Sequence, residues 1–303
     1  MKKLLVTFAT GFISLFSFAQ KIDKIINPTE VERIERILSA DDMQGRKTFT
    51  PGIDKAADFI AAEFAKSKLR YFGNLKSYFQ EFAMTKSKPV EVSGSIDNEP
   101  LTTDNIAANT TAKEISINSL KDYEVVIIRA TDTFNRKVFP LFELEKNLLV
   151  LVDTAHRNRF KSIQRFAGNA KFPSGVSQVF VLTGNLNPTA FNLHIKNEQT
   201  AQYLKNVIGV IPGKSRKDEL VVFSGHYDHL GIGKPDKNQD SIFNGANDDA
   251  AGTTAVMMLA RYFGEMKNNE RTLIFVAFTA EEIGGFGSRY FSKQMNPDKV
   301  VAM

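Results

Sequence analysis

The 303-residue chain is 43% hydrophobic and 24% charged, which is ordinary for a globular protein of one large domain or two modest ones. Its net charge of +5 comes from interspersed basic and acidic residues, and no nucleic-acid-binding motif is present, so we expect no nucleic-acid partner. The complete absence of cysteine excludes a thiol nucleophile, disulfides and thiolate metal ligands. Any metal must therefore be held by His, Asp and Glu.

Residues 1–19 have the features of a signal peptide. Lys2 and Lys3 precede an apolar stretch, Leu4–Phe16, and the small residues Ser17 and Ala19 fit cleavage after Ala19. The apolar stretch is too short to span a bilayer comfortably. We therefore expect an exported protein, periplasmic or extracellular, with no transmembrane segment after signal removal.

Two helices and a strand are predicted in residues 20–85, the first part of the expected main domain. Asn27 can cap a helix that begins at Pro28 and has one apolar face. After a polar loop, a second helix is predicted from the spacing of Ile53, Ala57, Ile60 and Phe64. Tyr78–Met84 alternates like a strand.

Residues 86–204 differ in character and predict an accessory insert rich in strands. Short β-like runs such as "YEVVIIRA" and "NLLVLVD" are separated by polar connections, with one helical candidate at Lys161–Ala167. His156 and His194 lie in this insert, far along the chain from any acidic cluster. We interpret both as packing or surface residues.

Residues 205–303 predict an α/β core. The runs "NVIGVIPG", "ELVVFSGHYDH" and "TLIFVAFT" lack polar alternation, which is typical of strands covered on both faces. A helical stripe follows "NDDAAG", between the last two runs. We expect an α/β fold with a mixed, mostly parallel sheet flanked by helices.

Three polar clusters lie just after an apolar strand or at the start of a helix: His226/Asp228/His229, Asp248/Asp249 and Glu281/Glu282. The carboxyl ends of strands are where open α/β sheets bind ligands, so the clusters are expected to converge. Residues two apart in a strand point the same way, so Asp228 can reach the ring of His226 and fix its tautomer. Structural alternatives remain: either aspartate can cap the helix, "AEEIGG" can be an exposed turn, and "HYD" can hold a packed histidine.

Together the segments "SGHYDHLG", "NGANDDAAGT" and "FTAEEIGGFGS" resemble the signatures of the di-zinc aminopeptidase family, metallopeptidase family 28, which includes aminopeptidase Y and bacterial leucyl aminopeptidases. The segments that precede the catalytic signatures in exported bacterial members are also similar to parts of this chain, namely "LSADDMQGRKTFTPG", "YFQEF" and "NVIGVIPG". The resemblance covers about residues 35–84 and 205–303. It implies that the insert occupies the place of a protease-associated domain and that residues 205–303 form the catalytic core.

Carried over by position, the resemblance implies two zinc ions. His226 would bind one ion, Asp248 would bridge both, and Glu282 would bind the other. Glu281 would be the general base, Asp228 the partner of His226, and His229 a residue of the site wall. A hydroxide bridging the two ions would attack the first peptide bond of peptides or proteins with a free N-terminus. The resemblance also implies a cis peptide bond between Asp248 and Asp249.

The sequence departs from the family after "NPDKVVAM". Relatives carry an Asp or Glu after such a strand and a later His as further zinc ligands, and neither occurs in these 303 residues. We therefore expect a C-terminally truncated chain with an incomplete metal site. Alternative functions are a related co-catalytic zinc carboxypeptidase or deacylase, and a non-catalytic binding protein on a peptidase scaffold.

Overall fold

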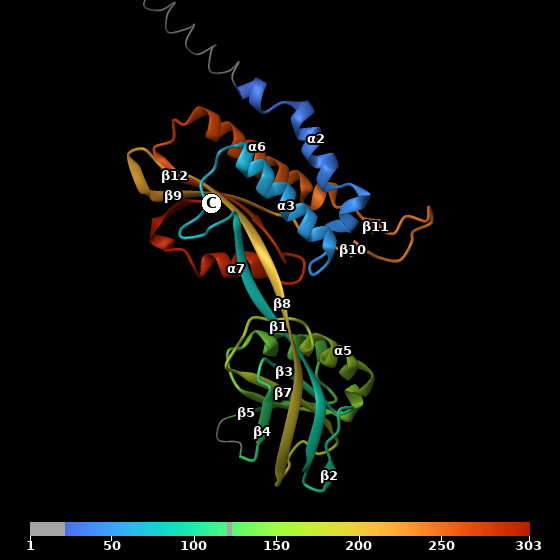
Figure 1. The fold of residues 1–303 in the computed structure, drawn as a ribbon. Helices are drawn as coiled ribbons and strands as arrows, with labels where there is room; N and C mark the ends of the chain where they lie inside the picture. Colours follow the sequence, from blue (N-terminus) through green and yellow to red (C-terminus); the bar gives the residue numbers. More distant parts are fainter. Residues whose placement is uncertain (1–21, 120–122) are drawn as a thin grey trace, which may run out of the picture. The chain divides into compact units, whose positions relative to one another are not determined.

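The structure, a computed structural model, describes residues 22–119 and 123–303 (Figure 1). The expected signal peptide, residues 1–19, lies outside the described residues. The chain divides into two compact units, one made of residues up to Phe82 together with Leu204–Met303, and the other of Ala83–Tyr203. The sequence placed the insert at residues 86–204. No helix in the described ranges combines the length and the apolar character needed to cross a membrane.

The first unit, the core unit, contains α2 (Pro28–Leu38), η1 (Asp41–Arg46), α3 (Pro51–Lys66), β9 (Arg216–His226), β10 (Gly231–Ile232), β11 (Ile242–Phe243), η5 (Ala246–Ala250), α6 (Ala251–Met266), β12 (Arg271–Phe278), α7 (Phe286–Ser292), η6 (Pro297–Lys299) and β13 (Val300–Ala302). Two long strands, β1 (Phe79–Ile96) and β8 (Phe191–Ile211), have residues in both units. The sheet order through the core unit is β13-β9-β12-β8-β1. Strands β13, β9 and β12 are parallel, and β8 is antiparallel to β12, so the predicted mixed sheet is confirmed.

Helices cover both faces of this sheet, with α2, α3 and α6 on one side and α7 on the other (Figure 1). Strand β12 shows why its sequence lacks polar alternation. Leu273, Phe275 and Ala277 pack under α2, α3 and α6. Ile274 and Val276 pack on the opposite face with Phe291 of α7. Both faces of β12 are therefore buried, as the uninterrupted apolar run predicted.

The first two predicted helices are confirmed. The side chain of Asn27 accepts a hydrogen bond from the backbone N–H of Glu30 at 3.1 Å, which caps α2 at the residue before Pro28. In α3, the predicted apolar residues are all buried: Ile53, Ala57, Ile60 and Phe64. These faces bring α2 and α3 onto the sheet beside α6.

The second unit, the insert unit, contains β2 (Glu99–Pro100), β3 (Ile106–Thr110), β4 (Glu114–Ile117), β5 (Glu124–Ile128), α4 (Phe134–Val138), η3 (Phe139–Glu143), β6 (Leu148–Asp153), η4 (Thr154–His156), α5 (Arg157–Ala167) and β7 (Ser177–Thr183). Its own sheet has the order β3-β7-β6-β5, in which β5, β6 and β7 are parallel. His156 is buried against Phe134 and bonds the carbonyl of Arg129 at 2.9 Å. His194 lies 3.0 Å from the hydroxyl of Ser116, so both histidines have local partners.

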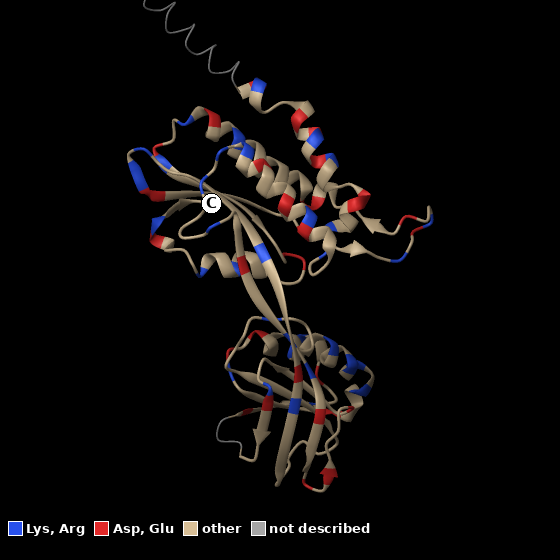
Figure 2. Ribbon diagram, viewed as in Figure 1, with Lys and Arg blue, Asp and Glu red and all other residues tan. Residues whose placement is uncertain are grey.

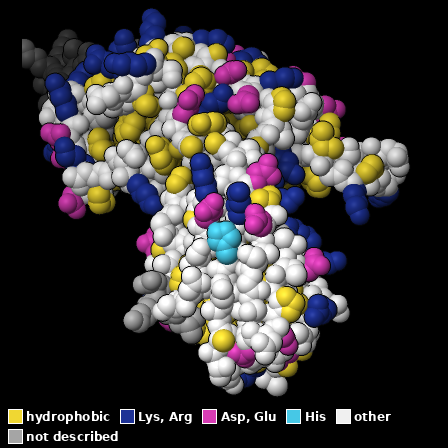
Figure 3. Space-filling model, turned by 60° about the horizontal axis from the view of Figure 1, so that its bottom comes forward, with side chains coloured by type: hydrophobic (Ala, Val, Ile, Leu, Met, Phe, Trp, Pro, Cys, Tyr) yellow, Lys and Arg dark blue, Asp and Glu magenta, His cyan; other side chains and the backbone are white. Residues whose placement is uncertain are grey.

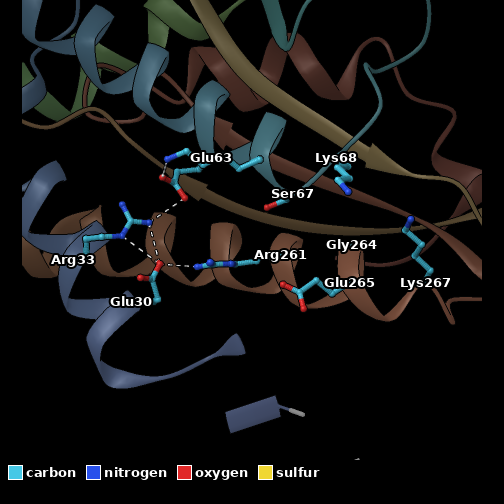
Figure 4. A pocket seen from close by; sticks show the side chains of 10 residues that line it. Glu30, Arg33, Glu63, Ser67, Lys68, Arg261, Gly264, Glu265 and Lys267 are labelled. Carbon is cyan, nitrogen blue, oxygen red and sulfur yellow. Dashed lines mark hydrogen bonds and ion pairs between the residues drawn. The ribbon is translucent and has the colours of Figure 1, made fainter. Parts of the chain in front are cut away.

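Charges of both signs are interspersed along α2 and α3 of the core unit, as Figure 2 shows. The face seen in Figure 3 likewise carries basic, acidic and hydrophobic side chains side by side. A charged cleft of about 810 Å³ lies among α2, α3 and α6 in the core unit. In it Glu30 accepts bonds from Arg33 and Arg261, and the buried carboxylate of Glu63 accepts a bond from Arg33 (Figure 4). This network joins the three helices.

Candidate metal centre

The three polar clusters meet at one end of the core sheet. Strands β9 and β12 are parallel with Phe278 paired to His226, so the residues after both strands emerge at the same edge. The second cluster, Asp248/Asp249, belongs to η5, which leads into α6 beside β9. The sequence therefore predicted the convergence correctly from the positions of the clusters at strand ends and at a helix start.

His226 is oriented by its neighbour two residues on. Its Nδ1 lies 3.2 Å from the backbone carbonyl oxygen of Asp228, while the carboxylate oxygen Oδ1 of Asp228 is 3.8 Å away. A proton on Nδ1 donates to that carbonyl and leaves Nε2 as the free nitrogen. Nε2 points to the second cluster, 3.2 Å from Oδ1 of Asp248, and lies 3.9 Å from Oε2 of Glu281. The ring of His226 is thus oriented by the backbone carbonyl of Asp228, whereas the sequence predicted orientation by the Asp228 carboxylate.

The Asp228 carboxylate links the first cluster to the third. It is fully buried and accepts the backbone N–H groups of Glu281 at 3.0 Å and Glu282 at 3.2 Å. Burial raises the pKa of Asp228 to about 6, and the two N–H bonds oppose that rise because they favour the ionised form. Asp228 therefore positions the chain at Glu281 and Glu282 rather than facing solvent.

The two adjacent aspartates have different surroundings. The peptide bond between Asp248 and Asp249 is cis, as the resemblance implied. Asp249 accepts the backbone N–H of Gly252 at 3.0 Å, near the start of α6, and the backbone N–H of His226 at 3.0 Å. The helix-cap alternative therefore describes Asp249, which also ties α6 to β9. The side chain of Asp248 is 62% exposed and faces the imidazoles.

His229 lies within the cluster. Its Nδ1 is 2.8 Å from Oε1 of Glu282 and 4.0 Å from Oδ2 of Asp248. One ligand atom from each of these three residues lies within 4.8 Å of the other two. The sequence had placed His229 only in the site wall. A second imidazole three residues after His226 was the signal for a closer role.

These side chains fit zinc. Zinc prefers imidazole nitrogen and carboxylate oxygen when thiolates are absent, and two ligands of one tetrahedral ion are about 3.3 Å apart. The 3.2 Å between His226 Nε2 and Asp248 Oδ1 matches that separation. Asp248 presents its second oxygen toward His229 and Glu282, so its carboxylate lies between two groups of donors. The donor set therefore suits a divalent ion and allows Asp248 to serve two.

Arg46 is a further residue at the site that sequence reasoning missed. Its side chain is completely buried and donates hydrogen bonds to backbone carbonyls of the segments that carry the first two clusters. It lies in "DDMQGRK", which read as a polar loop. No pattern in the sequence marks this arginine as buried. Because arginine side chains are rarely buried, an exposed position was expected.

Known proteins share this part of the chain. Residues 206–303 match the model of peptidase family M28. A probable zinc metalloprotease of Pyricularia oryzae is 34% identical over 90 residues, which are 30% of this chain and 17% of that protein. The aminopeptidase NAALADL1 of Rattus norvegicus is 28% identical over 134 residues, 43% of this chain and 15% of that protein. The chain thus spans less than a fifth of the length of these two relatives.

A solved structure, an aminopeptidase from Aneurinibacillus sp. strain AM-1, aligns with a TM-score of 0.47 at 18% identity, over 92% of this chain and 69% of that one. The matched segment 206–303 contains all three polar clusters, from His226 to Glu282. Residues 206–303 of the chain thus match peptidase family M28, in agreement with the motifs that carry the resemblance.

Proposed function

We propose that the protein is a zinc-dependent aminopeptidase that hydrolyses the N-terminal peptide bond of peptides or proteins. The observation that carries this proposal is the convergence of three side chains: Nε2 of His226 lies 3.2 Å from Oδ1 of Asp248 and 3.9 Å from Oε2 of Glu281. Glu282 and His229 border the other side of Asp248. Three segments far apart in the chain thus form one rim of nitrogen and oxygen donors.

Each residue has a separate task in this proposal. His226, Asp248 and Glu282 would hold two zinc ions, with Asp248 shared between them. Bound zinc would lower the pKa of a water molecule and polarise the scissile carbonyl. Glu281 is 55% exposed and lies beside the donor atoms, so its carboxylate can accept the proton of the attacking water and pass it to the leaving amine. Asp228 holds the backbone of Glu281 and Glu282 in place.

Substrate and location are further parts of the proposal. The family and the relatives named aminopeptidase support peptide substrates with a free N-terminus. The signal-like residues 1–19 support export to the periplasm or the outside of the cell, with cleavage after Ala19. N-terminal sequencing of the mature protein tests this cleavage.

The activity is tested with the complete gene product, meaning the protein encoded by the whole reading frame that contains these residues. We expect bound zinc, release of the N-terminal residue from an unblocked peptide, and loss of that activity on chelation. Glu281→Gln should lower kcat at least 100-fold with unchanged zinc content, because general base catalysis contributes 10²–10⁴-fold. Glu265→Gln, on exposed α6 surface, is the matched control and should keep full activity.

The outcomes separate the alternatives. A Glu281→Gln variant that retains activity within threefold would remove Glu281 as the base. Release of the C-terminal residue, or hydrolysis of only an N-acylated amino acid, would instead support the carboxypeptidase or deacylase alternative. A gene product that binds no zinc and cleaves neither kind of substrate would support the non-catalytic alternative.

A further inference from the structure

Arg46 connects two segments that approach the candidate metal centre from different parts of the chain. Its Nε donates to the carbonyl of Tyr227 at 2.9 Å, between His226 and Asp228. Its Nη1 and Nη2 donate to the carbonyls of Asn244 at 2.6 Å and Gly245 at 2.8 Å, just before Asp248. A single guanidinium therefore bonds the main chain of both segments that carry the first two clusters.

Two more bonds fix Arg46 itself. Nη1 also donates to the carbonyl of Leu38, the last residue of α2, at 2.6 Å. The carbonyl of Arg46 accepts the backbone N–H of His229 at 3.1 Å. Arg46 therefore joins the end of a helix packed in the hydrophobic core to the segment from Tyr227 to His229. Such a connection transmits the rigidity of the core to the donor atoms.

The neighbouring glycine makes the same connection at the level of the backbone. Gly45 has φ +63°, and a Cβ built on it would lie 2.6 Å from the carbonyl oxygens of both Gly231 and Phe243. These residues belong to β10 and β11, which follow His229 and precede Asn244. Only glycine allows so close an approach with that φ. The chain at Gly45 and Arg46 is thus pressed between the two segments, independently of the arginine side chain.

The charge of Arg46 is unusual in its surroundings. The side chain is completely buried, and among the described residues no carboxylate lies within ion-pair distance of it. Burial lowers the pKa of Arg46, while the nearby carboxylates of Asp228, Asp249 and Asp248 oppose that change. A guanidinium satisfies several carbonyls in one plane because its N–H groups form a fixed fork, whereas a lysine ammonium is a point donor.

We propose that Arg46 is a positioning residue for the metal centre: it sets the spacing between the segments carrying His226 and Asp248, so that the donor atoms are arranged before a metal binds. This inference rests on the proposed function because it assumes that these donors bind zinc. It assigns Arg46 no contact with substrate or metal. The fork of the guanidinium, rather than its charge, is the property required.

The test measures zinc affinity of the complete gene product by competition with a chromophoric chelator. Arg46→Lys keeps the charge but not the fork, and Arg46→Met removes both. We expect each variant to bind zinc at least tenfold more weakly, since loss of a residue that orients metal ligands costs 10–100-fold. With Co²⁺ in place of zinc, the visible absorption of both variants should differ from that of the unmodified protein, because the ligand geometry changes.

Phe64→Leu is the matched control, because it destabilises the same core through a buried residue of α3 that is remote from the donors. It should keep zinc affinity within threefold. Arg46→Lys with unchanged affinity and Co²⁺ spectrum would overturn the inference, as would an equal loss of affinity in the control. An unmodified protein that binds no zinc would instead overturn the proposed function.

Amide hydrogen exchange covers the case in which neither Arg46 variant folds. In the zinc-free, unmodified protein the amides of His229, bonded to the carbonyl of Arg46, and of Ala250, bonded to the carbonyl of Gly245, should be protected to a similar degree. Rapid exchange of the His229 amide in folded, zinc-free protein would show that the donor segment is not held before metal binds, and would overturn the inference.

Discussion

Replacing Asp228 with asparagine separates protein stability from metal binding. In the folded protein, burial raises the pKa of Asp228 from 3.8 to about 6. At 1.36 kcal/mol for each pKa unit, the ionised carboxylate costs the fold about 3 kcal/mol at neutral pH. Asparagine removes that cost. It also offers only one oxygen to the two amides of Glu281 and Glu282, so one buried N–H loses its acceptor, which costs about 1–3 kcal/mol.

These two effects nearly cancel, so Asp228→Asn should change the free energy of unfolding by less than about 2 kcal/mol. Zinc affinity should nevertheless fall about 10–100-fold, because the segment carrying Glu282 loses one of its anchors. Urea unfolding of zinc-free protein at pH 7 measures the first quantity, and chelator competition measures the second. Zinc affinity equal to that of the unmodified protein, or destabilisation above about 3 kcal/mol, would refute the reasoning.

Three further changes test other parts of the structure. His229→Ala removes the 2.8 Å hydrogen bond to Glu282 and should weaken zinc binding about tenfold. His229→Gln keeps a hydrogen-bond donor and should weaken zinc binding less. Equal zinc affinities of these two variants in a competition titration would contradict this. Burial lowers the pKa of Lys171 to about 8, so the charged side chain destabilises the fold below that pH. Lys171→Met should therefore raise the free energy of unfolding, measured in urea at pH 7, by about 1–3 kcal/mol. This difference between the variant and the unmodified protein should disappear between pH 8 and 10.5. Hydrogen bonds from Arg261 and then Arg33 lower the pKa of Glu30, so its ionised form stabilises the fold above pH 4.5, and this contribution is lost as the pH falls further. In urea titrations, Glu30→Gln should lower the free energy of unfolding by about 1 kcal/mol at pH 7, and the difference should shrink below pH 4.5. A difference that stays constant with pH would contradict the assignment.

The layers of the core unit could be predicted from the sequence because their signals are local. The cap at Asn27, the apolar spacing in α3 and the uninterrupted run in β12 each report burial directly through periodicity. The short helix α4 in the insert unit has only five residues, Phe134–Val138, too few for a helical period to show. It was therefore not predicted.

The rim of donors could also be predicted, because the ends of parallel strands place His226 and Glu281 at one edge. The contacts that hold the donor segments in place could not be predicted. Arg46 bonds the carbonyls of Tyr227 and Gly245, which are 181 and 199 residues away, and any residue type provides such a carbonyl. Asp228 was expected beside His226, whereas its carboxylate binds amides 53 and 54 residues further along the chain. Backbone partners leave no trace in side-chain patterns.

We propose that His226, Asp248 and Glu282 hold zinc at the carboxyl edge of the core sheet. Anomalous diffraction from crystals of the zinc-loaded gene product, collected on both sides of the zinc absorption edge, tests it most directly. We expect two neighbouring anomalous peaks, one beside His226 and the other beside Glu282, with Asp248 contacting both. Zinc peaks confined to other residues, or no peak between His226 and Glu282 in fully loaded crystals, would contradict it.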